Sequence, residues 1–200
     1  MTERFWFGKK YAGGGVEVAD EPRRCSWGDT DDKLMREYHD TQWGKPCYDE
    51  CELFEMLILE GAQAGLSWAT ILHKREAYRA AFDGFDVTAV SNYGEDKIAE
   101  LIRNTGIVRN RLKIGAAITN ARAILRLGSL SEFFWKYVDG QPIMGAWERQ
   151  EDVPVTTPLS DRISKDLKKL GFKFVGSTIV YSYMQAVGMV NDHMKWCEFR

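Results

Sequence analysis

The chain has 200 residues, a formal net charge of −2 and a hydrophobic fraction of 44%. This length suits one large domain or two small lobes that share a core, and the near-neutral charge excludes a surface coated with basic residues. A local basic patch can still bind nucleic acid, because net charge does not report how charges are distributed. The sequence contains neither a secretory signal nor about 18 consecutive apolar residues. We therefore expect a cytoplasmic protein without a membrane partner, whose cysteines stay reduced.

The pattern of the chain changes after its first 23 residues. Residues 1–23 mix glycines and charges without a clear period, which predicts a loosely packed N-terminal extension. Residues 24–200 are typical of successive helices, and we expect a single α-helical domain there, with a division into two lobes around a pocket left open. The predicted fold class is all-α, because no clear run of alternating strands is present.

Five segments carry the strongest helical signals. The predicted helices cover residues 49–75, 93–106, 109–128, 157–171 and 173–190. Gly61 and Gly65 indicate a break or close packing within the first of them, and Gly106 and Gly128 are the predicted C-caps of the next two. Thr157 is the predicted N-cap of the fourth. The fifth is rich in β-branched residues, but its length favours a buried helix over a strand.

Cysteine and histidine residues at the two ends of this helical region suggest a metal site. His193 and Cys197 are four residues apart, so they share one face if this segment is helical. Cys25 and His39 would complete a Cys2His2 set, although their spacing matches no short zinc-finger pattern. Four protein ligands fill the tetrahedron of zinc, so such a metal would be structural. On the loop-entropy model, a cross-link over so long a loop stabilises by about 4–5 kcal/mol.

Two alternatives to this site remain open at the level of spacing. Cys47 and Cys51 form another pair four residues apart, and they are either competing ligands or two small packed residues. The pair at 193 and 197 is equally compatible with a capped C-terminal helix that carries a half-buried thiol.

Glu60 interrupts an apolar face of the helix predicted over residues 49–75. A carboxylate on such a face is rarely buried unless it is paired, because its desolvation is costly. One explanation is a buried salt bridge, and another is a helix that ends near Gly61 and lets Glu60 reach water. The functional explanation is a pocket that binds a cationic ring. The aromatic residues nearby in the sequence are Trp27, Tyr38, Trp43 and Trp68.

A basic stretch lies between Glu100 and Glu132, which have no acidic residue between them. Its basic residues are Arg103, Arg109, Arg111, Lys113, Arg122 and Arg126. Two helices joined by a short glycine-containing turn can direct backbone N–H groups at a phosphate, with arginines alongside. A solvated basic helix face has the same pattern, so the stretch alone does not decide between the two.

Several motifs together resemble the 3-methyladenine DNA glycosylase I family of base-excision repair. They are RCSWG, YHDTQWG, FEMLILEGAQAGLSW, TGIVRNRLKI, PVTTPLSDRISKDLKKLGFKFVGSTIVYSYMQAVG and VNDH-x3-C, and they span roughly residues 24–197. The resemblance implies an all-α fold related to the helix-hairpin-helix glycosylases. It also implies one structural zinc ion per chain that joins the N- and C-terminal segments. The matching ligand positions are Cys25, His39, His193 and Cys197.

The resemblance implies an enzyme that hydrolyses the N-glycosidic bond of 3-methyladenine in damaged double-stranded DNA and releases the free base. The base is flipped into a pocket in which Glu60 is the expected catalytic and recognition residue. The matching aromatic positions of that pocket are Trp27, Tyr38, Trp43 and Trp68. Because the base is cationic, it leaves readily, which agrees with the absence of a catalytic Asp after the predicted hairpin.

The resemblance also implies a DNA-binding surface. Gly65 and Leu66 match a loop that fills the gap left by the flipped base. The positions that match the phosphate-contacting hairpin are Gly106, Arg109, Arg111 and Lys113. The sequence departs from the family at Leu112, where Gly is common, at Met35, where some members have an aromatic residue, and at Ala62, where a polar residue is usual. These departures bear on the hairpin turn and on base selectivity.

Two other functions compete with this interpretation. One is a zinc-stapled module that binds damaged DNA without cleaving it. The other is a zinc hydrolase, which four protein ligands disfavour because they leave no open position on the metal. The small size of the chain and the family resemblance predict a monomer.

Overall fold

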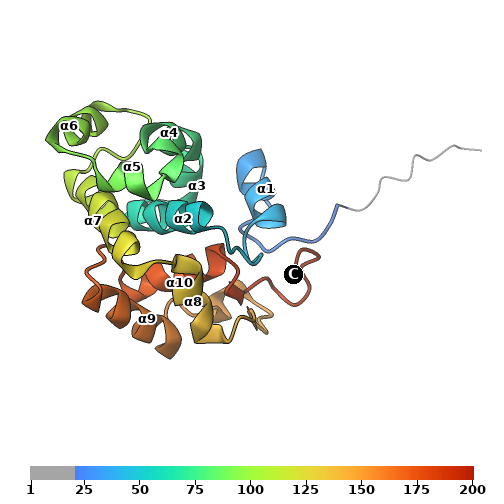
Figure 1. The fold of residues 1–200 in the computed structure, drawn as a ribbon. Helices are drawn as coiled ribbons and strands as arrows, with labels where there is room; N and C mark the ends of the chain where they lie inside the picture. Colours follow the sequence, from blue (N-terminus) through green and yellow to red (C-terminus); the bar gives the residue numbers. More distant parts are fainter. Residues whose placement is uncertain (1–20) are drawn as a thin grey trace, which may run out of the picture.

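A computed structural model describes residues 21–200, and helices are its dominant secondary structure (Figure 1). The predicted all-α class is therefore confirmed for the secondary structure of these residues. The extension predicted over residues 1–23 lies mostly outside the described residues, so the domain boundary stays a prediction. The α-helices are α1 (Lys33–Thr41), α2 (Glu50–Gln63), α3 (Trp68–Leu72), α4 (Arg75–Ala81), α5 (Val87–Ser91), α6 (Glu95–Arg103), α7 (Arg111–Leu127), α8 (Leu130–Trp135), α9 (Pro158–Lys169) and α10 (Ser177–Ala186).

Short elements join these helices. The 3-10 turns are η1 (Asp83–Phe85), η2 (Lys136–Val138) and η3 (Gln150–Asp152), and the strands are β1 (Ile143–Met144) and β2 (Val190–Asn191). The two strands pair in parallel, with Ile143 opposite Val190. No helix in the described part of the chain is long and apolar enough to cross a membrane.

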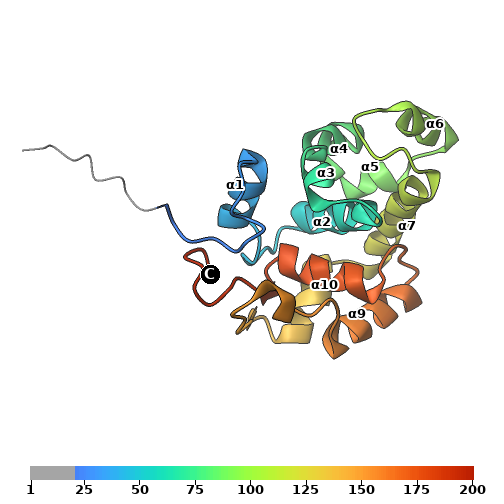
Figure 2. The same cartoon turned by 180° about the vertical axis from the view of Figure 1, so that it is seen from behind.

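Helix α2 occupies the centre of the molecule. Figures 1 and 2 show it between a group formed by α3 to α6 and a group formed by α8 to α10. Its residues 53–62 are all buried, as expected of a helix that is covered on every side. The side chain of Asp49 caps its first turn by accepting hydrogen bonds from the N–H groups of Cys51 and Glu52.

The helix predicted over residues 49–75 is broken after Gln63. Gly65 has a φ of 82°, a left-handed conformation that an L-residue adopts only with strain, and α3 begins at Trp68. Gly61 satisfies the other expectation, close packing, since a Cβ atom there would lie 3.3 Å from Phe174 Cβ. Both glycines thus have the roles that the sequence suggested, and the break places Trp68 on a separate helix.

The predicted C-cap at Gly106 is wrong. Helix α6 ends at Arg103 with Asn104 as its C-cap. Gly106 lies in the following turn, where a Cβ atom would be only 2.8 Å from Ala77 Cβ. A glycine is required there for a close approach between segments, which the local sequence does not reveal.

The caps predicted at Gly128 and Thr157 are confirmed. Gly128 ends α7 with a φ of 96°. Asn110, which was not predicted as a cap, begins this helix by accepting hydrogen bonds from the N–H groups of Leu112 and Lys113. Thr157 and Ser160 form a capping box at the start of α9. The segment over residues 173–190 contains the buried helix α10, as favoured, and then continues into β2.

The C-terminal segment is not helical, contrary to the helical arrangement considered for His193 and Cys197. Pairing with β1 holds Val190 and Asn191 extended, and residues 192–200 continue as turns. Lys195 donates its backbone N–H to the Trp147 carbonyl, which fixes this path. The half-buried thiol of the alternative interpretation is also wrong, because Cys197 is only 5% exposed.

Candidate active site and metal centre

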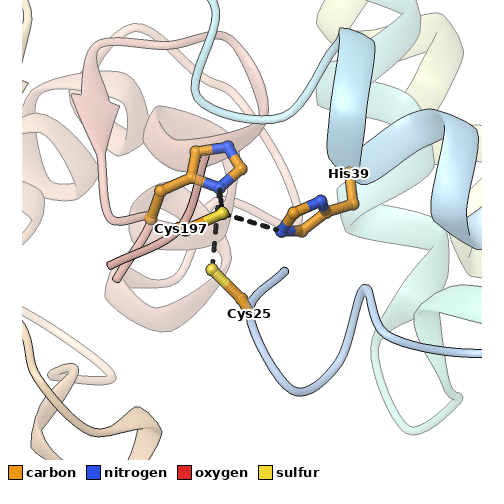
Figure 3. Close-up of side chains that lie close together, drawn as sticks. Cys25, His39 and Cys197 are labelled. Atoms are coloured by element: carbon orange, nitrogen blue, oxygen red, sulfur yellow. Dashed lines mark hydrogen bonds between the residues drawn. The ribbon is translucent and has the colours of Figure 1, made fainter. Parts of the chain in front are cut away.

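Cys25, His39, His193 and Cys197 converge in a buried cluster. Their ligand atoms all lie within 4.8 Å of one another. Cys197 Sγ is 3.3 Å from His193 Nδ1 and 3.7 Å from His39 Nε2, and Cys25 Sγ is 3.6 Å from His193 Nδ1. Figure 3 shows how Cys25, His39 and Cys197 approach one another from three separate segments. Tetrahedral zinc with thiolate and imidazole ligands separates ligand atoms by about 3.3–3.8 Å, so the geometry fits a metal ion.

The outer nitrogen of each imidazole has a partner that orients the ring. His39 Nδ1 is 2.7 Å from Asp40 Oδ1, and His193 Nε2 is 3.0 Å from the Trp43 carbonyl oxygen. Asp40 is itself paired with Arg24. Ligating histidines usually have such second partners, because these fix the tautomer that offers the other nitrogen to the metal. The cluster is thus organised to present two nitrogen and two sulfur atoms.

Burial disfavours charge on three residues of this cluster. It raises the pKa of the Cys25 thiol, lowers the pKa of His39 and lowers the pKa of His193 to about 4. Without a cation, the Cys25 thiol and both imidazoles are therefore uncharged at neutral pH. A bound divalent cation offsets the cost of thiolates, which are the form that binds metal.

The competing cysteine pair does not form a site. Cys47 Sγ lies 3.3 Å from Glu52 Oε2, whereas Cys51 Sγ donates to the Gly84 carbonyl oxygen at 3.0 Å. Among residues 21–200, the Cys2His2 cluster is the one group of potential ligands close enough to hold a metal.

A cavity of about 440 Å³ lies next to the Cys2His2 cluster. Its wall includes every residue predicted for the base pocket, namely Trp27, Tyr38, Trp43, Glu60 and Trp68. The rings form a continuous series, with centroids 5.0 Å apart for Trp27 and Trp43 and 5.2 Å apart for Tyr38 and Trp68. Met35 also lines this cavity. Aromatic faces around a carboxyl group suit a flat ring with positive charge.

Glu60 is the buried acid of this cavity. It is 4% exposed, and its Oε2 atom has no hydrogen-bond partner. Both simpler explanations of Glu60 are wrong: α2 continues to Gln63 and keeps it from water, and no salt bridge reaches it from residues 21–200. Burial raises the pKa of Glu60 to about 8. A buried acceptor without a partner is costly, which points to a ligand that supplies the missing donor.

Trp68 provides a second unpaired group in the same cavity. Its Nε1 atom is buried without a hydrogen-bond acceptor. Ser67 is the N-cap of α3 and immediately precedes Trp68. Two residues that line the cavity, Glu60 and Trp68, therefore each have a buried polar atom without a partner.

The Cys2His2 cluster supports the aromatic wall. The His39 ring lies 4.9 Å from Trp27, and the His193 ring lies 4.7 Å from Trp43. Since both tryptophans line the cavity, a shift of either imidazole would move the wall. The metal cluster and the cavity are thus parts of one structure.

The predicted DNA-binding residues lie in the loop after α2, in the turn after α6 and in the first turn of α7. Leu66 is 42% exposed beside Gly65, and Arg109 and Arg111 are exposed at the start of α7, where Arg111 pairs with Glu95. Lys113 is different, because its Nζ donates at 2.7 Å to the carbonyl oxygens of Ala62 and Ala64. Lys113 thereby ties the hairpin to the loop that contains Leu66.

Sequence reasoning missed the wall contributed by α10 and by the loop around η3. Thr178, Tyr181, Ser182 and Gln185 line the cavity from one face of α10, as do residues 150 and 153–155 from the loop. The spacing of Tyr181 and Gln185 by four residues was a detectable signal, since it puts two polar groups on one face of an otherwise apolar helix.

Comparison with known proteins agrees with this arrangement. The methyladenine glycosylase family matches residues 27–200. DNA-3-methyladenine glycosylase 1 of Escherichia coli K12 is 48% identical over 178 residues, which are 87% of this chain and 95% of the relative. The DNA-3-methyladenine glycosylase of Haemophilus influenzae is 41% identical, over 87% of this chain and 96% of its own.

Solved structures give the same result. A crystal structure of 3-methyladenine DNA glycosylase I has a TM-score of 0.86 and 49% identity, and the match covers 88% of this chain and 98% of that one. A variant of such an enzyme, solved in complex with 3-methyladenine, has a TM-score of 0.85 and 38% identity, with 88% and 96% covered. The chain described here belongs to the methyladenine glycosylase family and is a glycosylase, an enzyme that hydrolyses an N-glycosidic bond.

Proposed function

We propose that this protein removes 3-methyladenine from alkylated double-stranded DNA by hydrolysing its N-glycosidic bond. The observation that carries the proposal is the unpaired Glu60 carboxyl group in an aromatic cavity, beside the unpaired Trp68 N–H. A methylated adenine is flat, cationic and rich in N–H donors on its exposed edge, so it complements both features. The relatives named for this activity support the same substrate.

Base recognition follows from the charges involved. The cationic base lowers the pKa of Glu60 from its raised value, and the resulting ion pair offsets the cost of the buried carboxylate. Tyr38 and Trp68 stack against the ring, and Glu60 accepts a hydrogen bond from its edge. A neutral, unmodified adenine would gain the stacking without the ion pair, so the cavity favours the methylated base.

The chemistry requires little acid catalysis. The bond between the sugar C1′ and the base nitrogen breaks, and its electron pair neutralises the positive charge of the leaving base. Water adds to C1′ and its proton passes to solvent. Glu60 contributes by holding the base in the orientation in which this bond breaks, and by stabilising positive charge.

Access to the cavity requires the nucleotide to leave the duplex. Gly65 and Leu66 lie at the end of α2, next to the cavity that contains Glu60, and we assign Leu66 to the gap left in the base stack. Gly106, Arg109 and Arg111 are assigned to the phosphate backbone. Lys113 holds this surface together, because its Nζ donates hydrogen bonds to the carbonyl oxygens of Ala62 and Ala64 at the end of α2.

The metal in this proposal is one zinc ion per chain, held by Cys25, His39, His193 and Cys197. When bound, zinc would supply a structural cross-link and no reacting group, since four protein ligands leave no position for water. Its role is to support Trp27 and Trp43 through the two histidine rings.

The decisive experiment measures free 3-methyladenine released from methylated duplex DNA by the purified protein. We expect release by the wild type and a loss of at least about 100-fold in Glu60→Gln, which keeps the shape but removes the charge. Glu52→Gln is the matched control, because Glu52 is an exposed residue of the same helix outside this cavity. Full activity of Glu60→Gln would refute the pocket assignment, and no release by the folded wild type would refute the substrate.

A further inference from the structure

Asp192 is a buried carboxylate that the proposed mechanism does not use. It is 1% exposed and accepts three hydrogen bonds from side chains. Trp147 Nε1 donates to Oδ1 at 2.6 Å, and Oδ2 accepts from the Tyr181 hydroxyl at 2.6 Å and from Gln185 Nε2 at 2.8 Å. Among residues 21–200 no cationic side chain pairs with it, so its donors are all neutral groups. Such a group orients the side chains around it.

The orientation of Gln185 is the main consequence. A side-chain amide has a donor end and an acceptor end, and rotation by 180° exchanges them. A carboxylate only accepts, so the opposite orientation would place the Gln185 oxygen against an Asp192 oxygen. Asp192 therefore fixes the amide with Nε2 towards the carboxylate. The backbone of Gln185 is held as well, because its carbonyl oxygen accepts from the N–H of Gly44 at 2.9 Å.

Gln185 lines the same cavity as Glu60. One Nε2 hydrogen is bound to Asp192, and the amide oxygen is the acceptor that this orientation leaves for a ligand. We propose that Gln185, positioned by Asp192, presents a fixed acceptor that selects 3-methyladenine over 3-methylguanine. Adenine has an amino donor at position 6 of the ring, whereas guanine has an oxygen acceptor there. This inference rests on the proposed function, since it concerns which base the same cavity accepts.

Glu60 alone does not provide this selectivity. In the proposed function it forms an ion pair with a cationic base, and 3-methyladenine and 3-methylguanine are both cationic in DNA. The ion pair therefore attracts both bases. The Gln185 amide adds an orientation that Asp192 fixes. An acceptor fixed in this orientation repels the oxygen at position 6 of guanine, and 3-methylguanine is therefore disfavoured.

The test compares two products of one reaction. Duplex DNA methylated at both adenine and guanine is incubated with excess enzyme, and released 3-methyladenine and 3-methylguanine are quantified together. Gln185→Met removes the amide at nearly constant volume, and Asp192→Asn allows the amide to rotate. We expect the ratio of the two release rates to fall about tenfold in each variant, because one discriminating hydrogen bond is lost. Bound zinc is measured for each protein, since Asp192 precedes His193.

A matched control separates positioning from stability. Trp147→Phe removes another donor to Asp192 but leaves the bond to Gln185, so the rate ratio should stay at the wild-type value. General loosening of the site would slow both reactions equally and would not change the ratio. An unchanged ratio in Gln185→Met overturns the inference while leaving the proposed function intact. If the wild-type protein releases neither base, the proposed function itself is refuted.

Discussion

At the scale of the residue, Glu60 is a buried polar group whose missing partner lowers the stability of the free protein. The carboxyl group is buried on a central helix, and one of its oxygens lacks a partner. The sequence identified this residue because a charged side chain on an apolar face is unusual. It did not decide between a salt bridge, water and a pocket, since each depends on residues far away in the chain.

Glu60 should make the stability of the free protein depend on pH. The pKa is raised from an ordinary 4.5 to about 8 in the folded state, so between these values the folded form binds more protons than the unfolded form. The contribution of Glu60 is therefore lost as pH rises through this window. The advantage of Glu60→Gln in free energy of unfolding should grow by about 3 kcal/mol from pH 5 to pH 8.

Urea unfolding of both proteins at these two pH values measures this difference. Glu52→Gln, at an exposed position of the same helix, should show no comparable growth. A pH-independent advantage of Glu60→Gln would mean that Glu60 has an ordinary pKa.

At the scale of the element, the caps and breaks that depend on neighbouring residues were predictable. Thr157 and Gly128 act within their own helix turns, so the sequence contains the whole signal. Gly106 was assigned to the wrong role, because its need for glycine arises from Ala77 in another helix. The C-terminal segment was unpredictable for the same reason, since its path depends on pairing with β1.

Two glycines in open space provide a test of the break between α2 and α3. A Cβ atom at Gly65 or at Gly115 would meet nothing within 4 Å, so only the backbone conformation differs. Gly65 has a φ of 82°, and Gly65→Ala should destabilise by about 1 kcal/mol. Gly115 is inside α7, where Gly115→Ala should stabilise by about 0.5–1 kcal/mol. Equal effects of the two changes in thermal unfolding would contradict the strained turn.

The hairpin between α6 and α7 should respond to salt if it binds the DNA backbone. Arg109 is exposed and makes no salt bridge among the described residues, so its charge is available to a phosphate. Arg109→Ala should weaken DNA binding and reduce the slope of log affinity against log salt by about 1. Arg149→Ala, which removes an exposed arginine paired with Asp152, is the control. A slope that stays the same in Arg109→Ala would remove Arg109 from the DNA contact.

At the scale of the whole molecule, the metal cluster joins segments that are far apart in the chain. The ligand set was identified from the family resemblance, whereas spacing alone left it undecided between two cysteine pairs. What neither predicted is the contact between the cluster and the cavity wall, because this contact depends on the packing of His39 and His193 against Trp27 and Trp43. The cluster therefore supports the pocket as well as the fold.

If zinc occupies the Cys2His2 cluster as proposed, its removal should lower stability before it affects chemistry. A cross-link over this loop contributes about 4–5 kcal/mol on the loop-entropy model, so a strong chelator or Cys25→Ser should lower the urea midpoint markedly. At urea concentrations below this lowered midpoint the metal-free protein is still folded. It should then keep residual base release, because the proposed mechanism binds no reacting atom to the metal. Complete loss of release by a protein that is still folded, with recovery on adding zinc, would instead indicate a catalytic metal.

The distance in sequence between the ligands has a consequence for synthesis. Cys25 and His193 are separated by 168 residues. At about 5–20 residues per second, a ribosome needs roughly ten to thirty seconds to make the second after the first. During this time the Cys25 thiol has neither its metal partners nor its burial, and it is open to oxidants. A nascent chain in an oxidatively stressed cell is thus more vulnerable at Cys25 than the finished enzyme.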